Sequence, residues 1–187
     1  MSDVISSNNA ELASARGPAP IQLQVLFVCL GNICRSPTAH GVFESVVNSK
    51  GLSEHIAVDS AGTGDWHIGH EPDTRAQHSA KKRGYELAHL RARLVTPQDF
   101  QSYHYVLAMD HANLNDLRKL CPPNYGGVLD LFLKYSGEHQ HLLEVPDPYA
   151  GGEDGFEQVM DMVEDAAQGL LEHICVAHKF SAAPDCS

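Results

Sequence analysis

One stretch of the sequence decides the fold: Val25-Leu26-Phe27-Val28-Cys29-Leu30-Gly31-Asn32-Ile33-Cys34-Arg35-Ser36-Pro37. Its first four residues form a continuous apolar run, as in a strand that is buried on both faces of a sheet. Ser36 is a favoured N-cap residue, and Pro37 suits the first turn of a helix, where its missing N–H has no helical partner. Apolar residues then recur at helical spacing up to Gly51, which suits a helix end. The stretch predicts a strand, a loop and a helix in succession.

Further strands and helices follow along the chain. Segment 56–62 is a short strand that ends in small residues, and with the preceding strand and helix it predicts a right-handed βαβ unit with parallel strands. Apolar runs at 105–110 and 127–132 predict two more strands, and a long amphipathic helix is expected from an N-cap at Asp154. The sequence therefore predicts a single three-layer α/β domain. It contains an open four-stranded parallel twisted sheet with helices on both faces, in a doubly wound, flavodoxin-like arrangement.

Length and composition set the limits of this domain. The chain has 187 residues, which suits one compact unit. Residues 1–20 show no hydrophobic period and are expected to be a disordered extension, residues 21–180 form the domain, and residues 181–187 are expected to be a mobile tail. The net charge of -11 argues against nonspecific nucleic-acid binding. We expect a monomer or weak dimer.

Cysteine usage and hydropathy indicate the compartment. The five cysteines do not have the spacing of a disulfide framework. No signal peptide is recognisable, and no apolar run reaches the length needed to span a membrane. We therefore expect a protein of the reducing cytoplasm that does not insert into membranes.

The loop between the first strand and helix has the composition of a phosphate site. Backbone N–H groups converge at a helix N-terminus, and the helix dipole adds a positive partial charge there. Gly31 and Asn32 tolerate the positive φ angles that turn amides inward, and Arg35 offers two parallel donors to phosphate oxygens. Cys29 lies beneath this cradle, where the same field stabilises a thiolate nucleophile. The alternative, a buried cysteine with an arginine nearby by chance, leaves the Gly-Asn loop and the Ser-Pro helix start unexplained.

Residues 25–39 resemble the active-site loop of the low-molecular-weight protein tyrosine phosphatases, and the resemblance extends from about Gln24 to Lys179. It implies hydrolysis of phosphotyrosine proteins and small aryl phosphates through a phosphocysteine at Cys29, with no cofactor. The resemblance also defines a phosphate-binding loop that consists of Leu30, Gly31, Asn32, Ile33, Cys34 and Arg35.

The resemblance assigns the general acid to Asp147 in the Asp-Pro-Tyr motif of residues 147–149. By itself an Asp-Pro pair is a common turn. A tyrosyl phenolate is a poor leaving group, however, and needs a proton in the transition state. Family members often carry a second tyrosine where this chain has Ala150, so we do not expect regulation through a phosphorylated tyrosine pair.

Two aromatic residues are candidates for the pocket rim. Trp66 lies in a polar loop, where it either packs down as a hydrophobic cap or walls the pocket mouth and stacks on the leaving group. The resemblance favours the second role, and Tyr149 is the other rim candidate.

The resemblance also suggests a layer of residues that supports the loop. His89 is similar to the family histidine that joins a hydrogen-bond network with an asparagine and two serines, here Asn32, Ser36 and Ser60. The Ser36 hydroxyl would face the Cys29 sulfur. Arg91 and Arg93 are interpreted as solvated surface.

Cys34 lies five residues after Cys29 and has two possible roles. It either fills space behind the strand or acts as a resolving thiol that traps oxidised Cys29 as a reversible disulfide. The twelve histidines include the close pairs His67/His70 and His139/His141. Neither pair has a second cluster at a ligand-like spacing, so we predict no metal site.

Two other functions remain as alternatives. Thioredoxin-linked arsenate reduction occurs on the same fold, but it needs two further cysteines near the pocket, and only Cys121 lies between the loop and the last helix. A catalytically silent phosphotyrosine-binding module is the other alternative. Measured turnover separates both from a phosphatase.

Overall fold

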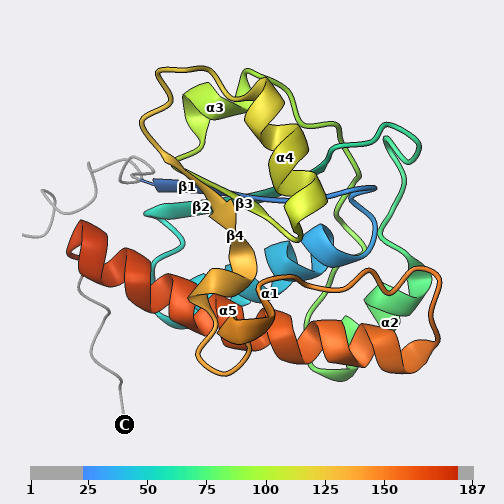
Figure 1. Cartoon of the computed structure of the whole chain (residues 1–187). Coiled ribbons are helices and arrows are strands. Elements are labelled where there is room, and N and C mark those ends of the chain that lie inside the picture. Colours follow the sequence, from blue (N-terminus) through green and yellow to red (C-terminus); the bar gives the residue numbers. More distant parts are fainter. Residues whose placement is uncertain (1–22, 181–187) are drawn as a thin grey trace, which may run out of the picture.

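The structure, a computed structural model, describes residues 23–180 and is built on a four-stranded parallel sheet. The strands are β1 (Leu23–Cys29), β2 (Ile56–Gly62), β3 (Tyr105–Ala108) and β4 (Val128–Leu131), in the spatial order β2-β1-β3-β4 (Figure 1). The chain therefore turns to opposite sides of β1, and the switch point of the sheet lies between β1 and β3. In open α/β sheets the crevice beyond the carboxyl ends of the strands at this point is the usual ligand site.

Helices cover both faces of the sheet, which confirms the predicted doubly wound architecture. On one side lie α1 (Arg35–Ser49) and α5 (Glu153–His178), against which α2 (Thr74–Lys82) packs (Figure 1). On the other side lie α3 (Asp99–Ser102) and α4 (His111–Leu120). Two short 3₁₀ helices, η1 (Phe132–Tyr135) and η2 (Gln140–Leu142), connect β4 to the segment before α5.

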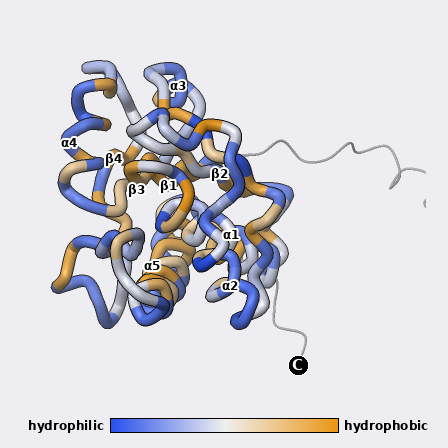
Figure 2. Tube along the Cα trace, turned by 90° about the vertical axis from the view of Figure 1, so that its right-hand side faces the viewer, coloured by the Kyte–Doolittle hydropathy of each residue, from blue (hydrophilic) through white to orange (hydrophobic). Residues whose placement is uncertain are grey.

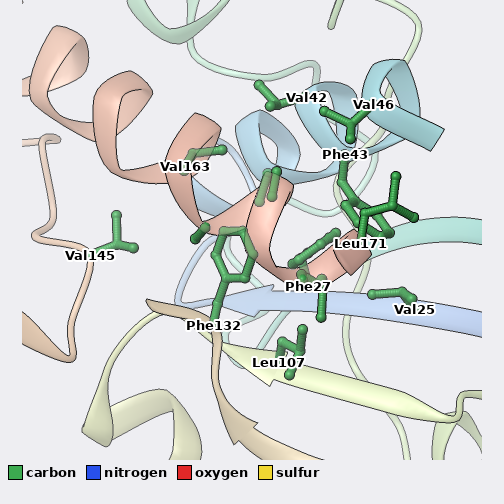
Figure 3. Close-up of a cluster of buried hydrophobic side chains, with 14 of the residues drawn as sticks. Val25, Phe27, Val42, Phe43, Val46, Leu107, Phe132, Val145, Val163 and Leu171 are labelled. Atoms are coloured by element: carbon green, nitrogen blue, oxygen red, sulfur yellow. The ribbon is translucent and has the colours of Figure 1, made fainter. Parts of the chain in front are cut away.

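Alternate residues of β1 point into two separate cores. Val25, Phe27 and Cys29 face α1 and α5, whereas Leu26 and Val28 face the side of α4. Phe27 makes edge-to-face contacts with two other phenylalanines, Phe43 and Phe132, with ring centroids 5.6 and 4.8 Å apart (Figure 3). Each fully buried aromatic or aliphatic side chain contributes about 1.5–3 kcal/mol by its removal from water. The strand that carries Cys29 is therefore held from both faces.

The hydropathy of the chain follows this arrangement. Figure 2 shows hydrophobic residues concentrated along β1 and the inward side of α5, and hydrophilic residues in the peripheral loops. Within residues 23–180, no helix has the combination of length and apolar character that crossing a bilayer requires. The predictions for residues 1–20 and 181–187 fall outside the described residues.

Two predicted helix N-caps are each wrong by two residues. The N-cap of α1 is Cys34, and Ser36 lies inside the first turn of the helix. The hydroxyl of Ser36 does not cap the helix, because it contacts the Cys29 sulfur and the Asn32 side chain. The N-cap of α5 is Gly152, so Asp154 lies in the first turn, where the helix dipole favours an acidic side chain. Gly51 ends α1 as predicted, with a φ of 68°.

Candidate active site

A pocket of about 150 Å³ opens beyond the carboxyl end of β1. Its floor is the loop between β1 and α1, and its walls come from the segment after β2 and the segment before α5. The lining residues are Cys29, Leu30, Gly31, Ile33, Cys34, Arg35, Trp66, His67, Asp147 and Tyr149. The fold thus brings together residues from three distant parts of the sequence, including every predicted catalytic and rim residue.

Carbonyl groups of the loop point away from the pocket because residues outside the loop bind them. The oxygen of Cys29 accepts from the Thr63 N–H at 2.9 Å, that of Leu30 from the Gly64 N–H at 2.8 Å, and that of Ile33 from the Asp73 N–H at 2.7 Å. Asn32 adopts a φ of 54°, the left-handed conformation that turns successive amides to one side. The Asn32 N–H points at the Cys29 sulfur at the base of the pocket, while these three carbonyls are bound by other segments.

Close packing against β2 fixes the position of this loop. A Cβ atom on Gly62, the last residue of β2, would lie 2.8 Å from the Leu30 carbonyl oxygen and 3.1 Å from the Asn32 nitrogen. Real Cβ atoms do not approach backbone atoms so closely, so only glycine fits at this point. The absence of a side chain at the end of β2 lets the loop lie directly against the strand.

The sulfur of Cys29 lies at the base of the pocket and is surrounded by donors. Its Sγ accepts a hydrogen bond from the Asn32 backbone N–H at 3.2 Å and lies 3.0 Å from the hydroxyl of Ser36. The side chain is 2% exposed and faces the N-terminus of α1.

Asn32 connects the loop to its surroundings through its side chain. Its Nδ2 donates to the hydroxyls of Ser36 at 2.9 Å and Ser60 at 3.0 Å, and its Oδ1 accepts from the Arg93 N–H at 2.9 Å. The residue is 2% exposed. Because one buried amide joins α1, β2 and the segment after α2, the positive φ of Asn32 is held from three directions.

Arg35 lies almost fully buried, and its guanidinium joins two loops. Nη1 donates to Asp110 Oδ2 at 2.6 Å and to the Val145 carbonyl at 3.1 Å, and Nη2 donates to Asp147 Oδ2 at 3.0 Å. Burial by itself lowers the pKa of the guanidinium, but Cys29, Asp110 and Asp147 outweigh it and raise the pKa above its ordinary value. Arg35 is therefore a permanent positive charge inside the pocket.

Aromatic side chains form the rim of the pocket. Trp66 and Tyr149 are 67% and 54% exposed, and both line the opening. Trp66 therefore forms part of the wall at the pocket mouth and does not pack down as a buried cap. Asp147 stands beside Tyr149, and its Oδ1 accepts from the Tyr149 N–H at 3.1 Å.

Comparison with known proteins identifies the family. The family model described as "Low molecular weight phosphotyrosine protein phosphatase" matches residues 24–179. The chain belongs to this family. A phosphatase of that name from Schizosaccharomyces pombe is 41% identical over 153 residues, which cover 81% of this chain and 97% of the relative. The human protein of the same name is 40% identical over 154 residues.

Solved structures of the family agree in fold. A protein tyrosine phosphatase from Entamoeba histolytica superposes with a TM-score of 0.79 at 38% identity, over 85% of this chain and all of that one. A Drosophila protein described as an arginine phosphatase superposes with a TM-score of 0.75 at 32% identity, over 81% of this chain and 98% of that one. The solved structures that this chain resembles therefore include phosphatases with different named substrates.

The family histidine was assigned to the wrong residue. His89 is exposed and forms no hydrogen bond to Asn32, Ser36 or Ser60 within the described part of the chain. His40 takes this place, because it lies on the second turn of α1, facing β2, with its Nδ1 3.4 Å from the Ser60 hydroxyl. His40 is only 7% exposed, and burial lowers its pKa. The signal that could have found it is its spacing of four residues from Ser36 on the same helix face.

Asp110 and Arg93 were also misjudged from the sequence. Asp110 was placed at the end of a strand without a role, yet it binds Arg35 and caps α4 by accepting from the Asn113 N–H at 2.7 Å. Its position directly after a strand that neighbours β1 was the available signal. Arg93 is not simply solvated surface: its guanidinium pairs with Asp59 and Asp99 at 2.8 and 3.1 Å.

Cys34 packs behind the loop, away from solvent. It contacts a small cluster with Ile33, Ala76 and Phe156 and is 5% exposed. Burial, followed by the charges of Asp73, Cys29 and Asp147, raises the pKa of the Cys34 thiol to about 12. Burial and these charges therefore disfavour the Cys34 thiolate, and Cys34 reacts more slowly than an ordinary exposed cysteine.

Proposed function

We propose that this chain is a protein tyrosine phosphatase in which Cys29 is the nucleophile, Arg35 and the loop amides bind the phosphate, and Asp147 is the general acid. The observation that carries the proposal is that one pocket holds all three side chains, with a donor-rich loop as its floor. Family membership independently favours the same reaction.

In the first step the Cys29 thiolate attacks the phosphorus of a phosphotyrosine. The S–P bond forms while the P–O bond to the tyrosyl oxygen breaks, and Asp147 transfers its proton to that oxygen. Arg35 now binds Asp147 at Nη2, and an incoming phosphate dianion would compete for this donor.

In the second step water attacks the phosphocysteine. Asp147, now a carboxylate, accepts a proton from that water, and the S–P bond breaks to release inorganic phosphate and the Cys29 thiolate. The Ser36 hydroxyl, 3.0 Å from the sulfur, is placed to donate to the thiolate as it leaves. The inward N–H groups and Arg35 bind the equatorial oxygens through both steps.

The walls of the pocket favour an aromatic phosphomonoester. Leu30, Ile33, Trp66 and Tyr149 line it with apolar surface suited to a phenyl ring. Cys29 is 2% exposed at the base of the pocket, so a long phosphotyrosine reaches the sulfur more readily than phosphoserine or phosphothreonine. Phosphoarginine is the comparison substrate, because a structural relative is described as an arginine phosphatase.

Metal-free hydrolysis tests this proposal. Wild type, Cys29→Ser and Asp147→Ala are compared on a phosphotyrosine peptide, a phosphoarginine peptide and an aryl phosphate. We expect turnover of the first and third substrates, loss of turnover in Cys29→Ser, and a decrease of about 10²–10⁴-fold in Asp147→Ala. A preference for phosphoarginine, or activity that survives Cys29→Ser, would overturn the proposal.

The arrangement of the cysteines does not favour arsenate reduction. Cys121 packs with the core on the α4 side of the sheet, whereas Cys175 packs with the core on the α5 side. Neither lines the pocket, so neither is placed to relay a disulfide from Cys29. Cytoplasmic location and a monomeric or weakly dimeric state complete the proposal.

A further inference from the structure

We propose that Glu144 and His111 form a positioning pair that holds the segment carrying Asp147 against the N-terminus of α4. The inference rests on the proposed role of Asp147 as general acid. Neither residue lines the pocket, and each acts through the residues next to it in the sequence.

One carboxylate oxygen of Glu144 binds both the backbone N–H and the ring of His111. Glu144 Oε1 accepts from the His111 backbone N–H at 2.8 Å and lies 2.5 Å from its ring Nδ1. His111 is the first residue of α4, where backbone N–H groups lack helical partners and the dipole favours a carboxylate. Hydrogen bonds from the His111 backbone and then its ring lower the pKa of Glu144 below its ordinary value.

The same turn also holds Arg35. Asp110 precedes His111 and binds Arg35 Nη1 at 2.6 Å, and Arg35 Nη2 in turn binds Asp147. The start of α4 is therefore bonded to Glu144 directly and to Asp147 through Arg35, and Asp147 lies only three residues after Glu144 in the chain. Together these bonds fix the distance between the segment that carries Asp147 and the guanidinium of Arg35.

The segment between Glu144 and Asp147 is stiff, so a displacement at one end reaches the other. The N–H of Val145 donates to the Met109 carbonyl at 2.8 Å, and its side chain is buried at the edge of the core (Figure 3). Pro146 and Pro148 flank Asp147; each has a fixed φ and restricts the residue before it. Losing the anchor at Glu144 would therefore tilt the carboxyl of Asp147.

A strained turn immediately precedes the anchor. Leu143 has a φ of 62°, and the Glu144 N–H donates to the Leu142 carbonyl at 2.8 Å across it. Such a turn is unfavourable for a residue with a side chain, and it persists only where the surroundings fix it. Leu142 and Leu143 are 44% and 42% exposed and supply little packing. Glu144 bonds to His111 on the turn itself, and the next residue, Val145, is anchored through its N–H bond to Met109.

Both side chains of the pair are partly exposed, so we expect the pair to affect the position of Asp147 more than the stability of the fold. The side chains of His111 and Glu144 are 53% and 45% exposed, and exposed ion pairs add little to the free energy of unfolding. The sensitive measurement is therefore the dependence of turnover on the leaving group. Phenyl phosphate needs a proton from the general acid, whereas p-nitrophenyl phosphate has a good leaving group and needs it much less.

The experiment compares kcat on these two substrates for Glu144→Ala, Glu144→Gln, His111→Ala and Asp147→Ala. We expect Glu144→Ala to lose about tenfold in kcat on phenyl phosphate and less than about twofold on p-nitrophenyl phosphate. Glu144→Gln keeps an oxygen for both donors and restores most of the rate. His111→Ala keeps the backbone N–H and falls in between. Glu138→Ala removes an exposed carboxylate of the neighbouring loop and is the matched control, with no change on either substrate.

The outcomes separate the two proposals. Asp147→Ala must discriminate between the substrates; if it does not, the role of Asp147 is wrong and the positioning pair fails with it. If Asp147→Ala discriminates but Glu144→Ala does not, the inference about the pair alone is wrong. Equal losses on both substrates with an unchanged melting temperature would also overturn it, because they would indicate damage to phosphate binding.

Discussion

The side-chain amide of Asn32 donates a 3.0 Å hydrogen bond to the hydroxyl of Ser60, which joins the loop beneath the pocket to strand β2. The same amide binds Ser36 on α1. The geometry of the phosphate cradle is thus set by a residue that does not line the pocket.

Replacing Asn32 with Ala should weaken both the fold and the reaction. The substitution removes three hydrogen bonds from a buried site and leaves Ala in a left-handed conformation, so the expected loss of unfolding free energy is on the order of 2–3 kcal/mol. We also expect a lower kcat, because the amide at Cys29 Sγ is displaced. Chemical denaturation and steady-state kinetics measure both effects. Asn48→Ala, at an exposed position on α1, is the control; equal kcat values for the two variants would contradict the prediction.

Gly62→Ala should impair turnover although Gly62 lies outside the loop. The added Cβ would meet the Leu30 carbonyl at 2.8 Å and must push the loop toward the pocket. We expect kcat to fall by at least about tenfold, since small displacements of catalytic groups have large effects. Gly126→Ala adds the same methyl group where nothing lies within 4 Å, and it should behave as wild type. Full activity of Gly62→Ala would show that the loop is not held as described.

The buried His40 should make stability depend on pH. Burial lowers its pKa from 6.5, against the attraction of Asp59 and Glu44, so the unfolded chain binds a proton more readily than the folded one. The free energy of unfolding should therefore decrease as the pH falls below about 6.5. His40→Gln should flatten this slope in urea titrations between about pH 5 and 7. His78→Gln, at an exposed position on α2, should leave the slope unchanged, and an unaltered slope in His40→Gln would contradict the prediction.

Cys34→Ser should leave resting activity near that of wild type but remove protection against peroxide. Peroxide oxidises Cys29 to a sulfenic acid, and attack by the Cys34 sulfur forms a disulfide and releases water. A dithiol then restores both thiols. Without Cys34 the oxidation continues to irreversible states, so activity should not return after reductant. Recovery of Cys34→Ser equal to that of wild type and of Cys121→Ser would refute the role.

Arg83 should be a stability residue remote from the chemistry. It joins the end of α2 to three carboxylates of α5, Glu157, Asp161 and Glu164, at 2.9, 2.8 and 2.7 Å. These groups are partly solvated, so Arg83→Ala is expected to lose only about 1 kcal/mol of unfolding free energy. Arg83→Lys keeps the charge but not the planar fork and should recover part of it. Both variants should keep the kcat of wild type; an unchanged midpoint of denaturation in Arg83→Ala would contradict the prediction.

Local sequence signals were sufficient for the sheet and for the loop that carries Cys29 and Arg35. The run at Val25–Val28 has the uninterrupted apolar character of a strand that is buried on both faces, and segment 56–62 begins with an apolar run and ends in small residues. Both strands appear where predicted. Cys29 and Arg35 are close in sequence, so one loop and one helix start were enough to bring them to the same place.

Side-chain partners from distant segments were harder to predict. Asp110 reaches Arg35 across 75 positions, and Arg93 reaches Asn32 across 61, so neither contact leaves a local pattern. His89 was named from the resemblance alone, whereas finding His40 required knowing which face of α1 turns toward Ser60. Ser36 was misplaced as an N-cap because its hydroxyl binds groups that only the folded pocket brings near.

Burial divides the pocket into two parts with different freedom to change. Cys29, Asn32 and Arg35 are at most 3% exposed and tied to several elements, whereas Trp66 and Tyr149 are more than half exposed and stand on separate loops. Substitutions at exposed positions seldom alter stability by more than about 0.5 kcal/mol. Substitutions in the two exposed loops can therefore change which phosphoproteins bind while the buried residues stay the same. Directed evolution of substrate specificity should begin with these two loops.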